Sequence, residues 1–120
     1  MSRTKEIRLL SICDDDGIRF SRELVLEQQG YEVASVSSDE HLDENRIVSF
    51  HIAILCHSLN AEDAARIAER LRKASPSIAV LRIHAIRSMV TRFYDVDCEV
   101  LPGPGQLLSG IQMLCARLKA

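Results

Sequence analysis

The stretch that most constrains the fold is 51–60, His-Ile-Ala-Ile-Leu-Cys-His-Ser-Leu-Asn. Four consecutive apolar residues, followed at once by polar ones, are typical of a short strand that is buried on both faces. Such strands lie in the middle of parallel sheets that carry helices on both sides. Cys56 would then stand at the carboxyl end of a central strand, which is where open α/β sheets place their ligands and their chemistry.

Strand and helix patterns alternate along the whole chain. Short apolar runs predict strands, and apolar residues at helical spacing predict helices. The expected strands are 7–13, 31–36, 52–55, 78–83 and 99–101, and the expected helices are 18–29, 39–45, 60–75, 86–93 and 107–118, with 102–105 as a loop. This alternation predicts an α/β protein, a three-layer, doubly wound, five-stranded parallel sheet with right-handed crossovers.

Local signals set the expected helix ends. In the first helix, Ile18, Leu24 and Val25 are expected on one side, and Gly30 should end the helix in the left-handed conformation. Asn60 is a good cap for the third helix. The remaining end signals are Ser37 or Ser38 as the cap of the second helix and Pro76 as the stop of the third.

Composition limits the function classes. The 120 residues suit a single domain, 1–120, and a net charge of −2 gives no electrostatic reason to bind nucleic acid or an anionic membrane. No apolar run approaches the roughly 18 residues of a membrane span, and the first ten residues lack the layout of a signal peptide. The chain is therefore expected in the cytoplasm, with its four cysteines reduced.

The order and spacing of these elements resemble the receiver domains of two-component response regulators, over nearly the whole chain. Receivers open with a buried strand that ends in an acidic pair, as in Leu-Leu-Ser-Ile-Cys-Asp-Asp-Asp at 9–16, and their first helix ends in Gly-Tyr, as at 30–31. Their third strand runs into the phosphoacceptor aspartate, and Cys56 stands at that position here. The resemblance implies a flavodoxin-like fold with strand order 2-1-3-4-5.

The family's phosphorylation chemistry is largely absent from the matching positions. Receivers use a carboxylate acceptor, a bound divalent cation, a hydroxyl after the fourth strand and a lysine before a proline. Cys56 has no carboxylate, Arg82 is the nearest match to the hydroxyl residue, and Gly103 takes the place of the lysine. The resemblance also implies a cis bond before Pro104. The sequence thus predicts a degenerate pocket in a pseudo-receiver that is not an enzyme and needs no cofactor.

The acidic cluster is open to two alignments. The family's pair falls on Cys13 and Asp14, or, with a one-residue deletion at Gly17, on Asp14 and Asp15. Asp14 is an acid of the pocket in both, and it could simply cap the following helix. A residual cation site at Asp14 and Asp15 is the weaker hypothesis, because a third carboxylate at position 56 is missing.

The thiols offer an alternative function. Cys13 and Cys56 would end neighbouring strands, where a disulfide between them is within reach, so the chain could be a small redox- or metal-responsive module. Cys56 as a catalytic nucleophile would need His57 or His84 as a base, yet consecutive residues of a strand point apart. In the simplest interpretation, the thiols are small buried hydrophobic groups.

The resemblance also implies a face for partners. Receivers bind partners through the fourth helix, fifth strand and fifth helix, and two arginines there are suited to paired hydrogen bonds with carboxylates. The expected face comprises Ile86, Arg87, Val90, Arg92 and Val100. The predicted function is therefore that of a stand-alone pseudo-receiver in signal transduction, which acts by phosphorylation-independent binding to another signalling protein or to a second copy of itself.

Overall fold

The structure is a computed structural model that describes residues 7–38, 40, 42–56, 58–83, 98–100 and 103–119. The strands are β1 (Arg8–Ile12), β2 (Glu32–Val36), β3 (Ile52–Leu55), β4 (Ala79–Ile83) and β5 (Cys98–Val100). The helices are α1 (Asp16–Gln28), α2 (Glu44–Ile47), α3 (Ala61–Ala74) and α4 (Pro104–Lys119). The expected helix at 86–93 lies outside the described residues.

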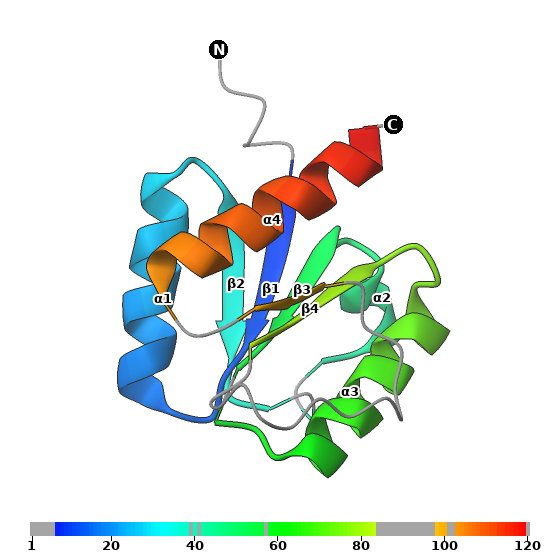
Figure 1. The fold of residues 1–120 in the computed structure, drawn as a ribbon. Coiled ribbons are helices and arrows are strands. Elements are labelled where there is room, and N and C mark those ends of the chain that lie inside the picture. Colours follow the sequence, from blue (N-terminus) through cyan, green and yellow to red (C-terminus); the bar gives the residue numbers. More distant parts are fainter. Residues whose placement is uncertain are drawn as a thin grey trace.

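The strands form one parallel sheet in the order β2-β1-β3-β4-β5, which confirms the predicted fold class and strand order. The central strand is β3, which pairs with β1 on one side, ending at Ile12 opposite Leu55, and with β4 on the other. All four residues of β3 are buried, as its apolar run requires. The carboxyl ends of β1 and β3 therefore meet at one edge of the sheet (Figure 1).

Helices cover both faces of the sheet, so the fold has three layers (Figure 1). Successive residues of a strand point to opposite faces, which divides the apolar side chains into two cores. On one face Leu10, Ile12 and Leu55 pack with Ile67 and Leu71 of α3. The opposite core is made by Leu9, Ile54, Leu81, Leu26, Leu107, Ile111 and Leu114.

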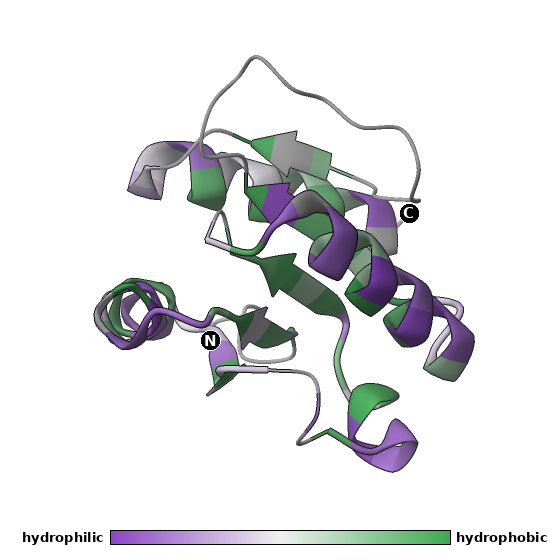
Figure 2. Ribbon diagram, turned by 90° about the horizontal axis from the view of Figure 1, so that it is seen from below, coloured by the Kyte–Doolittle hydropathy of each residue, from purple (hydrophilic) through white to green (hydrophobic). Residues whose placement is uncertain are grey.

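The colouring by hydropathy follows this division. In Figure 2 the strands are mainly green, whereas the helices show purple, hydrophilic residues among their apolar ones. In α1, Leu26 is buried and Leu24 is exposed, whereas Ile18 and Val25 are partly buried, so the prediction that Leu24 shares one side of the helix with Ile18 and Val25 is wrong. No helix in the described part of the chain combines the length and apolar character that crossing a bilayer requires.

The predicted signals at Gly30 and Asn60 are confirmed. Gly30 follows α1 and has a φ of +94°. Glycine adopts this left-handed conformation with little strain because it has no Cβ. The side chain of Asn60 accepts a hydrogen bond from the backbone N–H of Asp63 at 2.7 Å, and so caps α3.

The predicted second helix is placed wrongly. Among the described residues of this segment, the α-helix is the single turn α2, and Asp43 caps it by accepting a hydrogen bond from the N–H of Arg46 at 2.8 Å. Ser38 instead accepts from the N–H of Glu40. Serine and aspartate are both good N-caps, so the sequence alone does not distinguish Ser38 from Asp43 as the start of this helix.

The end of the predicted loop 102–105 is also wrong, because α4 already begins at Pro104. Proline suits the first turn of a helix, where its missing N–H leaves no hydrogen bond unmade. The carbonyl of Gly103 accepts from the N–H of Leu107 at 3.0 Å, which starts the helical pattern. The described residues contain no cis peptide bond, so the predicted cis bond before Pro104 is wrong.

Candidate functional site

Two cysteines stand side by side at the carboxyl edge of the sheet. Ile12 and Leu55 are the last register pair of β1 and β3, and Cys13 and Cys56 follow them directly. The N–H of Cys56 donates to the carbonyl of Ile12 at 3.1 Å, and the N–H of Cys13 donates to that of Val36 at 3.0 Å. The backbone of each cysteine is thus fixed by a neighbouring strand.

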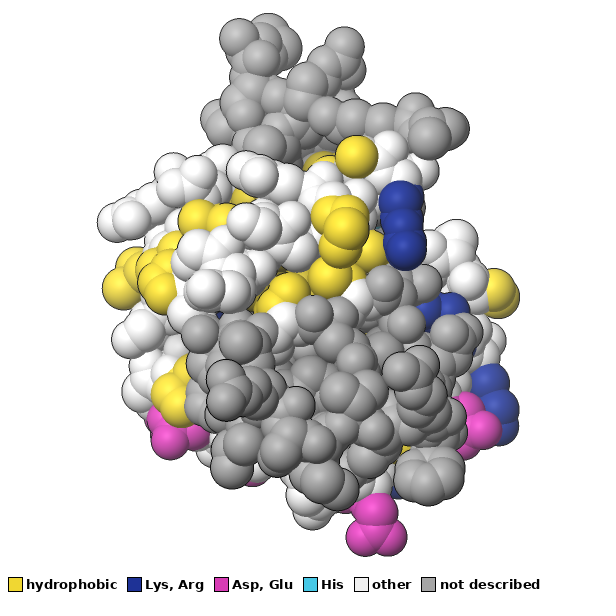
Figure 3. Space-filling view, viewed as in Figure 1, with side chains coloured by type: hydrophobic (Ala, Val, Ile, Leu, Met, Phe, Trp, Pro, Cys, Tyr) yellow, Lys and Arg dark blue, Asp and Glu magenta, His cyan; other side chains and the backbone are white. Residues whose placement is uncertain are grey.

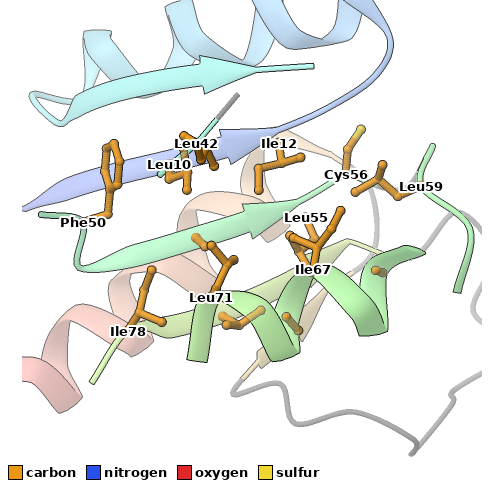
Figure 4. Close-up of a cluster of buried hydrophobic side chains, with 14 of the residues drawn as sticks. Leu10, Ile12, Leu42, Phe50, Leu55, Cys56, Leu59, Ile67, Leu71 and Ile78 are labelled. Carbon is orange, nitrogen blue, oxygen red and sulfur yellow. The ribbon is translucent and has the colours of Figure 1, made fainter. Parts of the chain in front are cut away.

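The two side chains converge. The thiol of Cys13 donates to the sulfur of Cys56, with 2.7 Å between the two Sγ atoms. Both residues are fully buried and both are free thiols. Figure 4 shows Cys56 just beyond Ile12 and Leu55, at the end of the buried cluster that α3 covers. The sequence prediction that these thiols lie within reach of each other is confirmed.

Ser58 links the thiols to an acid. Its hydroxyl donates to Oδ1 of Asp14, and it also lies 3.2 Å from the sulfur of Cys56 and 3.8 Å from that of Cys13. A hydroxyl has one proton to donate, so the carboxylate and the Cys56 sulfur compete for it. Ser58 therefore couples the charge of Asp14 to the thiol pair.

The two thiols have different acidities. Burial alone would raise the pKa of the Cys56 thiol, but the Arg22 guanidinium and hydrogen bonds from Cys13 and Ser58 outweigh it, so the pKa is lowered. Burial, together with the hydrogen bond that it donates to Cys56, raises the pKa of the Cys13 thiol. These opposite shifts make Cys56 the more acidic thiol of the pair.

The acids Asp14 and Asp15 are held by different partners. Asp15 caps α1, because its Oδ1 accepts from the N–H of Ile18 at 3.0 Å, so the interpretation of Asp14 as the helix cap is wrong. Asp14 turns instead to Ser58. Among the described residues, no group of three histidine, cysteine or acidic side chains is placed to hold a metal ion.

Arg82 is a residue within β4, opposite Leu55, rather than the residue after the strand. Its side chain donates to the carbonyl of Leu59 at 3.0 Å. The placement of Arg82 at the hydroxyl position of the pocket is therefore wrong, since β4 continues to Ile83. The residue after the strand is His84, which is outside the described part.

A cleft of about 500 Å³ opens between the start of α1 and the start of α4. Gly103 lines this cleft together with Asp15 and Arg22, so the structure does bring position 103 to the acidic end of α1. Its φ of +136° disfavours a residue with a side chain. Others that line the cleft are Ile18, Ile83 and Leu107.

Of the expected partner face, only Val100 lies among the described residues. It is half-buried at the end of β5 and packs against the core between the sheet and α4. Figure 3 shows hydrophobic side chains exposed over α1 and α4 on the side seen in Figure 1, in keeping with the exposure of Phe20, Leu24 and Met113. Ile86, Arg87, Val90 and Arg92 lie outside the described residues.

Sequence reasoning missed two members of this site, Ser58 and Arg22. Ser58 lies two residues beyond Cys56, in the loop where open sheets place their chemistry, so its position alone gave a signal. Arg22 is one of several charged residues on α1 and has no distinguishing pattern.

The fold is the flavodoxin-like fold of response regulator receivers, and solved structures share it. A receiver domain from Clostridium thermocellum superposes with a TM-score of 0.80 at 18% identity, covering 94% of this chain and 97% of that one. A CheY-like receiver from Methanospirillum hungatei gives 0.78 at 22%, with coverage of 94% and 97%. A pilus assembly-related protein from Burkholderia pseudomallei gives 0.78 at 16%, with coverage of 97% and 94%. No model of a known protein family matches the chain.

Proposed function

We propose that this chain is a pseudo-receiver, a cytoplasmic signalling module that acts by binding a protein rather than by accepting a phosphoryl group or catalysing a reaction. The fold it shares with receivers supports a signalling role. The observation that carries the proposal is the buried thiol of Cys56 at the end of β3, in contact with Cys13.

The chemistry of the edge supports this proposal. In receivers the phosphoryl group is transferred to a carboxylate oxygen, and a divalent cation neutralises the charge of the moving group. At the end of β3 the first side chain is a thiol, and the nearby acids are engaged elsewhere, Asp14 by Ser58 and Asp15 by the start of α1. Without phosphorylation as a switch, the conformational equilibrium of the protein is shifted by the partners that it binds.

The first prediction is that phosphoryl donors leave the chain unchanged. Incubation with acetyl phosphate and Mg²⁺ should give no phosphoryl adduct in the intact mass, because Cys56 offers no carboxylate. Beryllofluoride with Mg²⁺ should likewise leave the NMR spectrum unchanged. A receiver domain that has its phosphoacceptor aspartate, treated in parallel, is the positive control. An acyl phosphate on Asp14 or Asp15 would overturn the proposal.

The second prediction concerns the partner face. We propose that Arg87 and Arg92 bind carboxylates of a second copy or of another signalling protein. Arg87→Glu with Arg92→Glu should weaken self-association in sedimentation velocity, while the free energy of unfolding changes by no more than about 0.5 kcal/mol. The matched control is charge reversal of two exposed residues of α3, Arg66 and Lys73.

The outcome separates the two kinds of partner. If the parent chain stays monomeric at every concentration, a second copy is not the partner. If the parent associates and the double variant associates equally well, this face is not the one used.

A further inference from the structure

We propose that Cys13 and Cys56 form a peroxide-reactive thiol pair that closes into an intramolecular disulfide, with Cys56 as the reacting thiol and Cys13 as the resolving thiol. A small thiol or dithiol would reopen it. This goes beyond the proposed function and does not depend on it, because the reaction needs only residues of the chain itself and a hydroperoxide.

The strand pairing places the two cysteines at a spacing that suits a disulfide. Cys13 and Cys56 extend the register of two adjacent parallel strands. Neighbouring strands lie about 4.8 Å apart, and disulfides join Cα atoms about 4.4–6.8 Å apart. With their sulfur atoms 2.7 Å apart, the side chains face each other, so closure requires no movement of either strand.

The surroundings assign different roles to the two thiols. Cys13 donates its proton toward Cys56, and the Ser58 hydroxyl is 3.2 Å from the same sulfur. The Arg22 guanidinium lies beside Cys56, and its buried Nη1 has no hydrogen-bond partner among the described residues, so its positive charge favours an anion at the Cys56 sulfur. The lowered pKa of Cys56 agrees with this arrangement. The thiolate is the reactive form of cysteine.

Access limits the kind of oxidant. Both thiols are fully buried, which disfavours a bulky disulfide as the reactant. Arg22 lines the cleft between α1 and α4 and also lies beside Cys56, so the cleft leads to within one side chain of the sulfur. A hydroperoxide is much smaller than a disulfide reagent, so it is the oxidant that this burial disfavours least.

The reaction balances in two steps. The Cys56 thiolate attacks one oxygen of hydrogen peroxide, the O–O bond breaks, and the released hydroxide takes up a proton to give water, leaving a sulfenic acid. The Cys13 sulfur then attacks the Cys56 sulfur and the S–O bond breaks. The leaving hydroxide takes the Cys13 proton as a second water. Two thiols are oxidised to one disulfide, and one peroxide is reduced to two waters.

The test is mass spectrometry on the full chain after a limited dose of hydrogen peroxide. We expect a monomer that has lost two hydrogen atoms, and a non-reduced digest in which the peptides containing Cys13 and Cys56 are linked. Dithiothreitol should restore the original mass. The background variant Cys98→Ala with Cys115→Ala is the matched control and should form the same link. Linkage through Cys98 or Cys115, or no link while those two cysteines oxidise, would overturn the proposal.

The roles are tested with a carbon nucleophile that traps sulfenic acids, dimedone. In Cys13→Ser, peroxide should produce a dimedone adduct on Cys56, whereas Cys56→Ser should give none on Cys13. Arg22→Gln should slow the oxidation of Cys56 several-fold and shift its pH profile upward, a readout that lost packing alone would not move. Equal labelling in both serine variants would overturn the assignment, and peptide mapping of the parent chain tests the link itself if a serine variant does not fold.

Discussion

The variant Cys13→Asp with Cys56→Asp should unfold readily without a divalent cation and should be rescued by Mg²⁺. The two sulfurs are 2.7 Å apart, so carboxylates at these positions would meet in a site that is buried at present, close to Asp14. A buried charge without a partner costs about 3–5 kcal/mol, which is a large part of a folding free energy of about 5–15 kcal/mol. Oxygen ligands are what Mg²⁺ prefers.

The free energy of unfolding of this variant should depend on pH. Burial and like charge raise the pKa of a carboxyl above its unfolded value of about 3.9. The folded state then binds more protons than the unfolded state, so the free energy of unfolding decreases as the pH rises from about 4 through the raised pKa. Urea unfolding at several pH values, with and without Mg²⁺, measures both effects.

The matched control is Cys13→Asn with Cys56→Asn, which has nearly the same shape without charge. It should show neither the loss of stability above about pH 4 nor the rescue by Mg²⁺, because the amide does not ionise. If Mg²⁺ fails to stabilise the diaspartate variant, positions 13 and 56 do not correspond to the acidic positions of a receiver pocket.

The central strand made the fold predictable from the sequence. The apolar run 52–55 admits a strand covered on both faces, and the alternation of strands and helices then leaves few parallel arrangements. Strand order came from the resemblance to receivers, and the structure has that order. Helix ends were less predictable, because the cap at Asp43 and the start at Pro104 depend on local choices among several suitable residues.

The parts of the site that strand pairing positions were predictable from the sequence. Cys13 and Cys56 each follow a buried strand, so adjacent strands bring them together. Positions counted from the family were less secure, since Arg82 is one residue short of the strand end. Contacts made by long side chains, such as that of Arg22 with Cys56, depend on how the helix is rotated against the sheet, which no spacing in the sequence specifies.

Leu24 is a second case in which the rotation of α1 against the sheet was not predictable. It also supplies the control for a substitution of Leu55. The expected apolar side of α1 included it, yet it is 60% exposed, whereas Leu55 in β3 is 0% exposed. Because the buried face of α1 is set by Leu26, a rotation of the helix that buries Leu26 turns Leu24 toward solvent. The same substitution at Leu24 and Leu55 therefore separates burial from the chemistry of the side chain.

Leu55→Ala should lower the free energy of unfolding by about 2–5 kcal/mol, because it removes buried methyl groups and leaves a cavity. Leu55 is held between Ile12 and Arg82 in the paired strands and is covered by α3, so its neighbours have little freedom to close the space. Leu24→Ala should change the same quantity by no more than about 0.5 kcal/mol. Urea denaturation measures both, and the dependence on urea should be the same in the two variants, since neither changes the surface exposed on unfolding by much. Similar losses in the two variants would mean that β3 is not the buried centre of the sheet.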